Sequence, residues 1–228
     1  MTGAHGVLTF AANGSYSYHA NPNSSGVDVF NYTITDGDGD TSPSTLTITV
    51  ANGQPLVSAE SATVNEAALD AATDAGDLGH GTVTGSNPAS TAETTTGTLT
   101  FSDPDLPVTV TGVAAGNIGS DVSGNVGSNV TGSYGILHVN ANGSYSYTLT
   151  APYDTSPDAN NGTNTEPGRD VFTFTVTDGF GNTSTSTVSI SIVDDVPTAH
   201  VDGKSAQSGQ TVSGKVESND TAGADGIA

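Results

Sequence analysis

The stretch of sequence that decides the fold is residues 135–147, which read GILHVNANGSYSY. Apolar and polar side chains alternate on both sides of the central pair Asn142 and Gly143. A period of two is typical of β-strands with one buried face, and Asn-Gly between two such runs is a strong signal of a β-hairpin. The segment therefore predicts two antiparallel strands joined by a tight turn.

This hairpin belongs to an internal repeat. Residues 6–18 read GVLTFAANGSYSY, so the segment recurs at an offset of 129 residues, from 6 to 135. Residues 28–40 read DVFNYTITDGDGD and residues 170–182 read DVFTFTVTDGFGN, at an offset of 142. The difference, 142 − 129 = 13 residues, indicates an insertion in the second copy. Because this stretch is rich in Asn, Pro, Thr and Gly, we predict a surface loop over residues 150–169.

The repeat divides the chain into three parts. Residues 1–52 are the C-terminal part of one β-sandwich repeat, residues 53–194 a complete repeat, and residues 195–228 a linker and the start of the next. The complete unit is long enough to bury its own core. We predict an all-β fold of two-sheet antiparallel β-sandwiches in tandem, and expect the chain to be a piece of a longer array. Strands of the complete unit are expected near residues 56–64, 81–85, 96–101, 107–113, 134–140, 143–149, 170–177 and 185–193.

The chain is strongly acidic, with 24 Asp and Glu against 3 Lys and Arg and a net charge of −21 over 228 residues. Charged residues make up only 12%, about half the usual share of roughly 25%, so the acidity results from missing bases. Such a surface repels phosphate and attracts cations, which argues against nucleic acid as a partner. The chain has no cysteine, which excludes disulfides and thiol chemistry. No apolar run reaches the ~18 residues of a membrane span, so we expect no membrane insertion.

Acidic residues gather at turns and unit junctions, and they are the candidate ligands of a metal. Two carboxylates ~4 Å apart repel by about 4 kcal/mol at an effective dielectric constant of ~20. Only Arg169, Lys204 and Lys215 are available to neutralise them. Ca²⁺ relieves such repulsion, because it accepts carboxylate and carbonyl oxygens in flexible geometry. The candidate Ca²⁺ ligands are Asp36, Asp38, Asp40, Glu66, Asp103, Asp105, Asp178, Asp194 and Asp195.

Ordinary turn chemistry is the alternative interpretation of these acids. Asp-Gly is common in hairpin turns, and for Asp178 this role explains the sequence as well as metal binding does. For Glu66 the two interpretations are also balanced. The segment that starts at Asp36 is not an EF-hand, because Thr41 and Thr47 stand where that loop needs Gly and Glu. For Asp103, Asp105, Asp194 and Asp195 metal binding is the favoured interpretation.

No catalytic constellation emerges from the sequence, so we predict that the chain is not an enzyme. The five histidines share no metal-ligand spacing, and no Gly-x-Ser-x-Gly motif is present. Asp154 and Asp158 are spaced for a glycosidase pair, but a solvated loop explains them better.

In combination, the motifs of residues 6–18, residues 28–37 and the junction sequence VDDVP at 193–197 resemble the VCBS and cadherin-like repeats of giant bacterial RTX adhesins. Residues 64–69, VNEAAL, and residues 101–105, FSDPD, also resemble those proteins. The resemblance implies an all-β fold of immunoglobulin- or cadherin-like antiparallel β-sandwich repeats in tandem. It also implies type I secretion, a location on the outer surface of a Gram-negative cell, and partnership with neighbouring repeats of the same polypeptide.

The resemblance further implies calcium in the inter-domain linkers, with Asp194 and Asp195 as linker ligands and Glu66, Asp103 and Asp105 supplying others. The implied function is a calcium-stiffened extender that spaces a ligand-binding head from the cell for adhesion and biofilm formation. The alternative is a carbohydrate- or peptide-binding module that uses the 150–169 loop and exposed tyrosines. Residues 209–226 resemble the opening of a repeat and residues 6–50 the close of one, so head-to-tail self-association through the two ends is a further hypothesis.

Overall fold

The structure, a computed structural model, describes residues 1–69, 84–104, 107–153 and 162–224. In these residues the chain forms strands and two short 3₁₀ helices, η1 (Glu66–Ala68) and η2 (Glu217–Asn219). None of its described helices is long and apolar enough to cross a membrane. The all-β prediction is confirmed. The strands are β1 (Gly6–Phe10), β2 (Tyr16–Ala20), β3 (Gly26–Thr35), β4 (Thr41–Val50), β5 (Leu56–Val57), β6 (Glu60–Asn65), β7 (Thr94–Thr98), β8 (Phe101–Ser102), β9 (Thr109–Ala115), β10 (Asn129–Thr131), β11 (Gly135–Val139), β12 (Ser144–Leu149), β13 (Thr165–Thr177) and β14 (Thr183–Val193).

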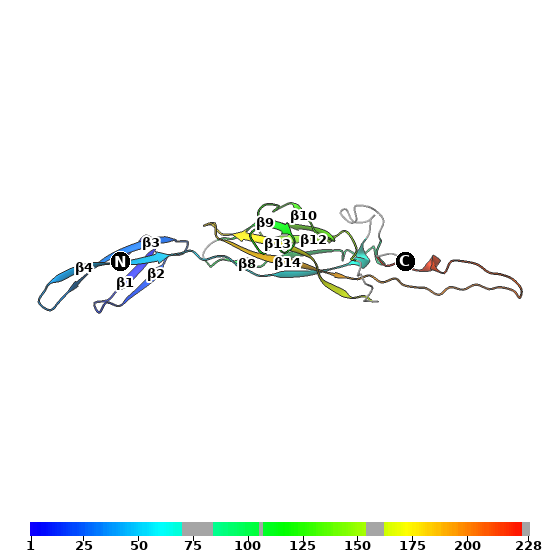
Figure 1. Cartoon of the computed structure of the whole chain (residues 1–228), viewed down its shortest axis with the longest axis horizontal. Helices are drawn as coiled ribbons and strands as arrows, with labels where there is room; N and C mark the ends of the chain where they lie inside the picture. Colours follow the sequence, from blue (N-terminus) through cyan, green and yellow to red (C-terminus); the bar gives the residue numbers. More distant parts are fainter. Residues whose placement is uncertain (70–83, 105–106, 154–161, 225–228) are drawn as a thin grey trace.

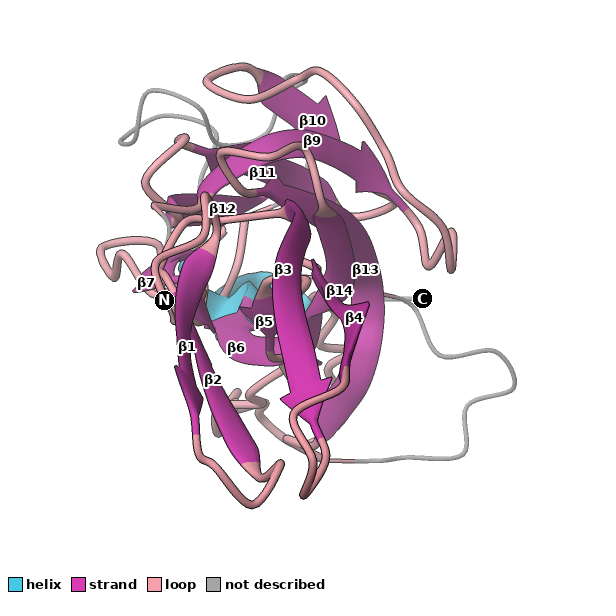
Figure 2. Ribbon diagram, turned by 90° about the vertical axis from the view of Figure 1, so that its left-hand side faces the viewer, coloured by secondary structure: helices cyan, strands magenta, loops and turns pink. Residues whose placement is uncertain are grey.

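The first part of the chain consists of two hairpins that face each other, β1 with β2 and β3 with β4 (Figures 1 and 2). Gly14 occupies the predicted turn of the first hairpin with a φ of 84°, a conformation that favours glycine. Aromatic rings join the hairpins, because Tyr18 meets Phe30 edge to face at 6.1 Å and Phe10 stacks on Tyr32 at 5.5 Å. Because aromatic and polar residues alternate along these strands, the aromatic face of one hairpin packs against the aromatic face of the other hairpin.

The second part is a sandwich of two four-stranded sheets, in the order β10-β11-β12-β7 and β6-β14-β13-β9. All neighbours in these sheets are antiparallel except β6, which runs parallel to β14. The inward side chains of both sheets form one core, in which each large apolar residue contributes about 1.5–3 kcal/mol by burial. The largest fully buried apolar side chains in this core are Leu69, Leu137, Tyr147, Leu149, Phe172, Phe174, Ile190 and Ile192.

The third part is an extended arm, residues 198–221, that projects beyond the sandwich at the end opposite the two N-terminal hairpins (Figure 1). A pair of backbone hydrogen bonds between Thr198 and Thr221 closes the base of this C-terminal arm. Gly209, with a φ of 86°, lies in the turn where the arm reverses. Residues 201–219 of the arm are exposed along their whole length.

The predicted strands agree with the structure in most places, and the differences have physical causes. The predicted loop over residues 150–169 is wrong at its end, because β13 begins at Thr165. A β-bulge between Glu166 and Asp170, with Gly168 at a φ of 63°, continues the strand through a polar sequence. Strand β10 was not predicted, since it has only three residues, and the strands predicted at 56–64 and 96–101 are each divided in two. The strand predicted at 81–85 falls largely outside the described residues, and no strand is present at residues 84–85.

Candidate functional site

Glu66 and Asp195 lie together at the end of the sandwich from which the C-terminal arm leaves. Glu66 follows β6 and Asp195 follows β14, and parallel strands bring their carboxyl ends to the same edge of a sheet. Asn65 fixes the start of η1, because its side chain accepts a hydrogen bond of 2.9 Å from the Ala67 N–H. The Asp195 N–H donates to Glu66 Oε2 at 3.4 Å. Both carboxylates are buried, Glu66 completely.

The Asp195 carboxylate connects the complete unit to the segment that follows it. Its Oδ2 accepts the Ser86 N–H at 2.7 Å and the Ala224 N–H at 3.1 Å, while Ser86 Oγ donates to Oδ1 at 2.5 Å. Glu66 Oε1 accepts the N–H of Tyr153 at 2.5 Å. The two acids therefore hold together the linker after β14, the loop before β7 and the end of the arm.

Glu93 is a third buried acid at this end, and sequence reasoning did not find it. Ala92, the residue before it, accepts a hydrogen bond of 2.9 Å from the N–H of Asn65, which precedes Glu66. The side chain of Glu93 is 2% exposed, and within the described ranges its Oε2 has no hydrogen-bond partner. A buried carboxylate oxygen without a partner is costly, and a cation would provide one. In the sequence, Glu93 is an isolated acid in a threonine-rich run, which gave no signal.

Asp194 adds negative charge beside this cluster. It is half-buried, and its N–H donates to the Asn164 carbonyl at 2.8 Å. Partial burial, together with the neighbouring charges of Asp195 and Glu166, raises the pKa of Asp194. We call Glu66, Glu93, Asp194 and Asp195 the junction acids.

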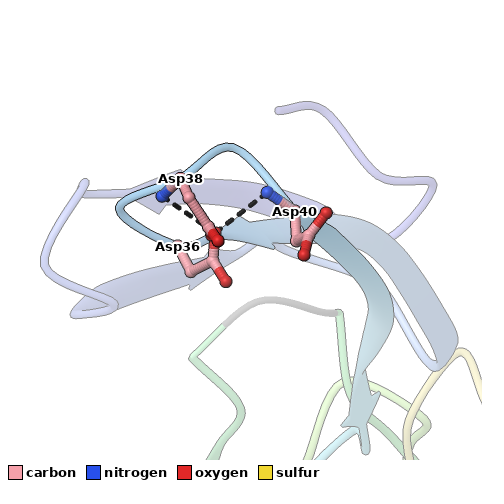
Figure 3. Close-up of side chains that lie close together, drawn as sticks. All are labelled: Asp36, Asp38 and Asp40. Atoms are coloured by element: carbon pink, nitrogen blue, oxygen red, sulfur yellow. Dashed lines mark hydrogen bonds between the residues drawn. The ribbon is translucent and has the colours of Figure 1, made fainter.

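The loop between β3 and β4 brings Asp36, Asp38 and Asp40 together at an exposed tip (Figure 3). Of the described residues, only these three place at least three carboxylate or imidazole ligand atoms within 4.8 Å of one another. Asp36 Oδ1 accepts the N–H groups of Asp38, Gly39 and Asp40 at 3.3, 3.0 and 2.9 Å. A hydrogen bond with the Asp38 side chain, followed by these backbone donors, lowers the pKa of Asp36. The same acid thus shapes the turn and offers its remaining oxygen to a ligand.

Asp178 forms the equivalent turn in the complete unit, where both of its carboxylate oxygens accept hydrogen bonds from the turn. Oδ1 accepts the N–H groups of Phe180 and Asn182 at 2.9 and 2.8 Å, and Oδ2 accepts Asn182 Nδ2 at 2.9 Å. Burial acts to raise the pKa of Asp178, but these hydrogen bonds outweigh it and the pKa is lowered. Asn182 Nδ2 also donates to the Gly53 carbonyl at 3.1 Å, which fastens the first linker to this turn.

The two linkers differ chemically although the repeat makes them equivalent. At the offset of 142, Asn52 and Gly53 of the first linker stand where the second has Asp194 and Asp195. Asp103 lies next to the first linker, because β8, which it follows, pairs with β5. The structure therefore separates Asp103 from the junction acids by the length of the sandwich. Asp105 lies outside the described residues.

Comparison with protein families matches the first part of the chain. Residues 1–53 match the family profile of the bacterial cadherin-like domain. No curated protein matches the chain. Domains of this kind commonly bind calcium, are typically structural or adhesive, and indicate an extracellular or surface protein. The match supports a cadherin-like repeat over residues 1–53, whose hairpin motifs recur at residues 135–147 and 170–182.

Proposed function

We propose that the chain is a calcium-stiffened extender segment of a bacterial surface adhesin, which spaces a ligand-binding head from the cell for adhesion and biofilm formation. The parent protein in this proposal is a Gram-negative adhesin of the RTX type, exported by type I secretion. The observation that carries the proposal is the burial of Glu66, Glu93 and Asp195 at the point where the arm leaves the sandwich. Acids are expensive to bury, so their position at a joint argues for a cation.

The residues present fit a calcium site in their chemistry. Carboxylate and carbonyl oxygens are the ligands that Ca²⁺ prefers, and the junction acids offer carboxylates from three different segments. The buried Oε2 of Glu93 and the raised pKa of Asp194 both indicate negative charge that the protein does not compensate. Bound Ca²⁺ would supply that positive charge. Glu66 and Asp195 would then be fixed relative to Glu93, and the linker after β14 would lose its freedom to bend.

The exposed tip formed by Asp36, Asp38 and Asp40 is a second, weaker candidate site. These side chains are exposed to water, which competes for the ion and screens their charges. The Asp36 Oδ2 and the carboxylates of Asp38 and Asp40 point to one side of the turn (Figure 3). A cation here would stiffen the tip of the β3–β4 hairpin without crossing a junction.

The mechanical role follows from charge and connectivity. With a net charge of −21, the parts of the chain repel one another, and a joint of few residues bends easily. Ions that neutralise the joint remove the repulsion and cross-link the segments. Because ion binding requires the folded arrangement of the acids, it also stabilises the fold.

The test is thermal unfolding of the full chain in Ca²⁺ and in EDTA, with Mg²⁺ as a control for non-specific charge screening. We expect Ca²⁺ to raise Tm by many degrees and small-angle scattering to show a longer particle. A Tm that is the same in Ca²⁺, Mg²⁺ and EDTA would refute the calcium site, while leaving the sandwich intact.

A carbohydrate-binding module is the second candidate, and one aromatic cluster favours it. The guanidinium of Arg169 lies 4.2 Å from the centroid of the Tyr153 ring, and Tyr134 meets Tyr153 edge to face at 5.2 Å. All three side chains are half-buried and border the insertion of the complete unit. Aromatic rings beside charged or amide groups are common features of ligand pockets. Loss of glycan-array binding in Tyr153→Ala, with Tyr16→Ala as control, would support this candidate over the extender.

A further inference from the structure

The two N-terminal hairpins leave exposed an inner face that their repeat equivalents bury. The exposed fractions are 39% for Phe10, 53% for Tyr16 and 63% for Ile34, against 0%, 7% and 0% for the equivalents Val139, Tyr145 and Val176. Phe10, Tyr16 and Ile34 line a groove of about 930 Å³ between the hairpins. Of the described strands, only β1 pairs with β2, so the other edge of β2 carries unpaired backbone groups. An apolar groove beside an open strand edge is a site for strand addition.

The complete unit shows which strand closes this face. There β7 pairs with β12, and Gly97 lies opposite Tyr145. A Cβ atom at Gly97 would lie only 2.5 Å from the Tyr145 hydroxyl. The Tyr145 ring in this position therefore favours glycine at residue 97. Beyond β7, the Leu99 N–H donates to the Gly143 carbonyl at 2.9 Å, and its side chain is 3% exposed in the core.

The C-terminal arm contains a segment with a similar pattern, which shares the first Thr and the Gly of β7 and has an aliphatic residue in place of Leu99. Residues 94–99 read TTTGTL and residues 211–216 read TVSGKV, at an offset of 117, and Asp220 follows as Asp103 does. The positions that face inward in the first segment are Thr95, Gly97 and Leu99, and their equivalents are Val212, Gly214 and Val216. Gly214 does not have a positive φ, so its backbone conformation does not account for the choice of glycine at this position.

This segment is exposed and cannot reach the hairpins of its own chain. Val212 is 42% and Val216 68% exposed, and the arm projects from the end of the molecule opposite the hairpins (Figure 1). Local charge is compatible with a contact, because Lys215 is the only charged residue of the segment 211–216, whereas residues 1–52 contain four Asp and neither Lys nor Arg. The rest of the arm contains Asp202, Glu217 and Asp220 besides Lys204, so the attraction is confined to this segment.

We infer that residues 211–216 of a second copy of the chain add to the open edge of β2 as an antiparallel strand. The repeat fixes the register: Gly214 lies opposite Tyr16 and Val212 opposite Tyr18, as Gly97 and Thr95 lie opposite Tyr145 and Tyr147. Val216 then fills the groove, and its N–H donates to the Gly14 carbonyl. Because the two contacting surfaces are at opposite ends of the chain, the contact is head-to-tail and builds open filaments rather than closed dimers.

Sedimentation velocity of the full chain over a range of concentrations tests this inference. We expect concentration-dependent association that either Tyr16→Asp or Val216→Asp weakens by about a hundredfold or more, since each buries an unpaired charge. Both residues are exposed in the single chain, so neither variant should disturb its folding. Ile118→Asp, at a position 46% exposed on the complete unit, is the matched control and should associate like the wild type.

Mixing the two variants distinguishes head-to-tail contact from other association. Each variant alone should be monomeric. An equimolar mixture should form dimers that do not grow, because the Val216→Asp copy keeps an intact groove and the Tyr16→Asp copy keeps an intact arm. Association that both variants leave unchanged would overturn the inference, as would a mixture that stays monomeric.

Two further measurements apply if the contact between separate chains is weak. The chain has no cysteine, so Ser17→Cys and Ser213→Cys copies, cross-strand neighbours in this register, should form a disulfide on oxidation, whereas Ser17→Cys and Ser205→Cys copies should not. In a fusion of two copies, the contact becomes intramolecular, and amide exchange at residues 16–20 of the second copy should slow. A monomeric wild type combined with unprotected amides in the fusion would also overturn the inference.

Discussion

The Tyr147 hydroxyl donates a hydrogen bond of 2.7 Å to Asp170 Oδ2, and this bond joins β12 in one sheet to β13 in the other. Asp170 also accepts the N–H groups of Ser133 and Tyr134, at 2.6 and 3.0 Å. The first repeat contains the same arrangement, in which Tyr18 donates to Asp28 at 2.8 Å. The partner acid and burial raise the pKa of both tyrosines, that of Tyr18 to about 12. These two aspartates are therefore structural acids that connect the sheets.

Tyr147→Phe should destabilise the complete unit by about 1–3 kcal/mol, because the buried Asp170 side chain loses one of its hydrogen-bond donors. Urea denaturation followed by far-UV circular dichroism measures the change. Tyr16→Phe, on an exposed ring, is the control and should leave the midpoint unchanged. Equal stability of Tyr147→Phe and wild type would show that the hydrogen bond does not hold the sheets together.

Gly132→Ala should also destabilise the complete unit, by about 1–3 kcal/mol, since overpacking a fixed site forces the structure to shift. A Cβ atom at Gly132 would lie 2.6 Å from Asp170 Oδ2. At Gly162 a Cβ atom would meet nothing within 4 Å, so Gly162→Ala is the matched control. The same denaturation experiment compares them, and equal midpoints would mean that Asp170 can move away at little cost.

Glu93→Gln should have opposite effects with and without calcium. In EDTA the variant should be as stable as wild type or more stable, because a neutral amide replaces a buried carboxylate whose Oε2 has no hydrogen-bond partner among the described residues. In Ca²⁺ it should lose most of the calcium-dependent rise in Tm. Calorimetric titration with Ca²⁺ and thermal melts provide the readout, with Glu217→Gln on the exposed arm as control. A variant that keeps the full calcium response would remove Glu93 from the site.

Asp178→Ala distinguishes the turn role of this acid from a metal role. Loss of an acceptor for Phe180 and Asn182 should lower Tm by several degrees, and by the same amount in Ca²⁺ and in EDTA. A loss of stability that occurs only in Ca²⁺ would instead assign Asp178 to a metal site. Asp38→Asn is the useful comparison, since Asp38 belongs to the equivalent turn but is exposed.

Asp194 should make stability in EDTA decrease as pH rises. Its pKa is raised in the folded chain, so its favourable contribution is fully present below the unfolded pKa, near 3.9, and is lost as pH rises through the folded value. Asp178, whose pKa is lowered, acts in the opposite sense and loses its contribution as pH falls. Asp194→Asn should therefore be more stable than wild type at neutral pH, with the gain disappearing in acid. Urea midpoints measured across this pH range check the sign, and an Asp194→Asn chain that gains nothing at neutral pH contradicts it.

The sequence by itself determined the local β-structure. Asn13-Gly14 and Asn142-Gly143 form hairpin turns as predicted, because glycine at positive φ and alternating side chains are properties of neighbouring residues. The repeated hairpin signals also indicated the sandwich architecture, since strands with alternating side chains have one apolar face to bury. The clustering of Asp36, Asp38 and Asp40 was likewise readable, because one turn contains all three.

Tertiary structure alone decided the rest. Glu66 and Asp195 meet because β6 lies parallel to β14, a pairing between strands more than a hundred residues apart. Asp28 and Asp170 are buried partners of tyrosines, although no residue beside them in the sequence indicates this role. The alternation of side chains and the preferences of turn residues act over a few neighbouring residues. The partner of a buried charged side chain depends instead on which distant strands become neighbours. Strand pairing therefore set the roles of the buried acids Glu66, Asp195, Asp28 and Asp170, whereas local sequence set those of the turn acids.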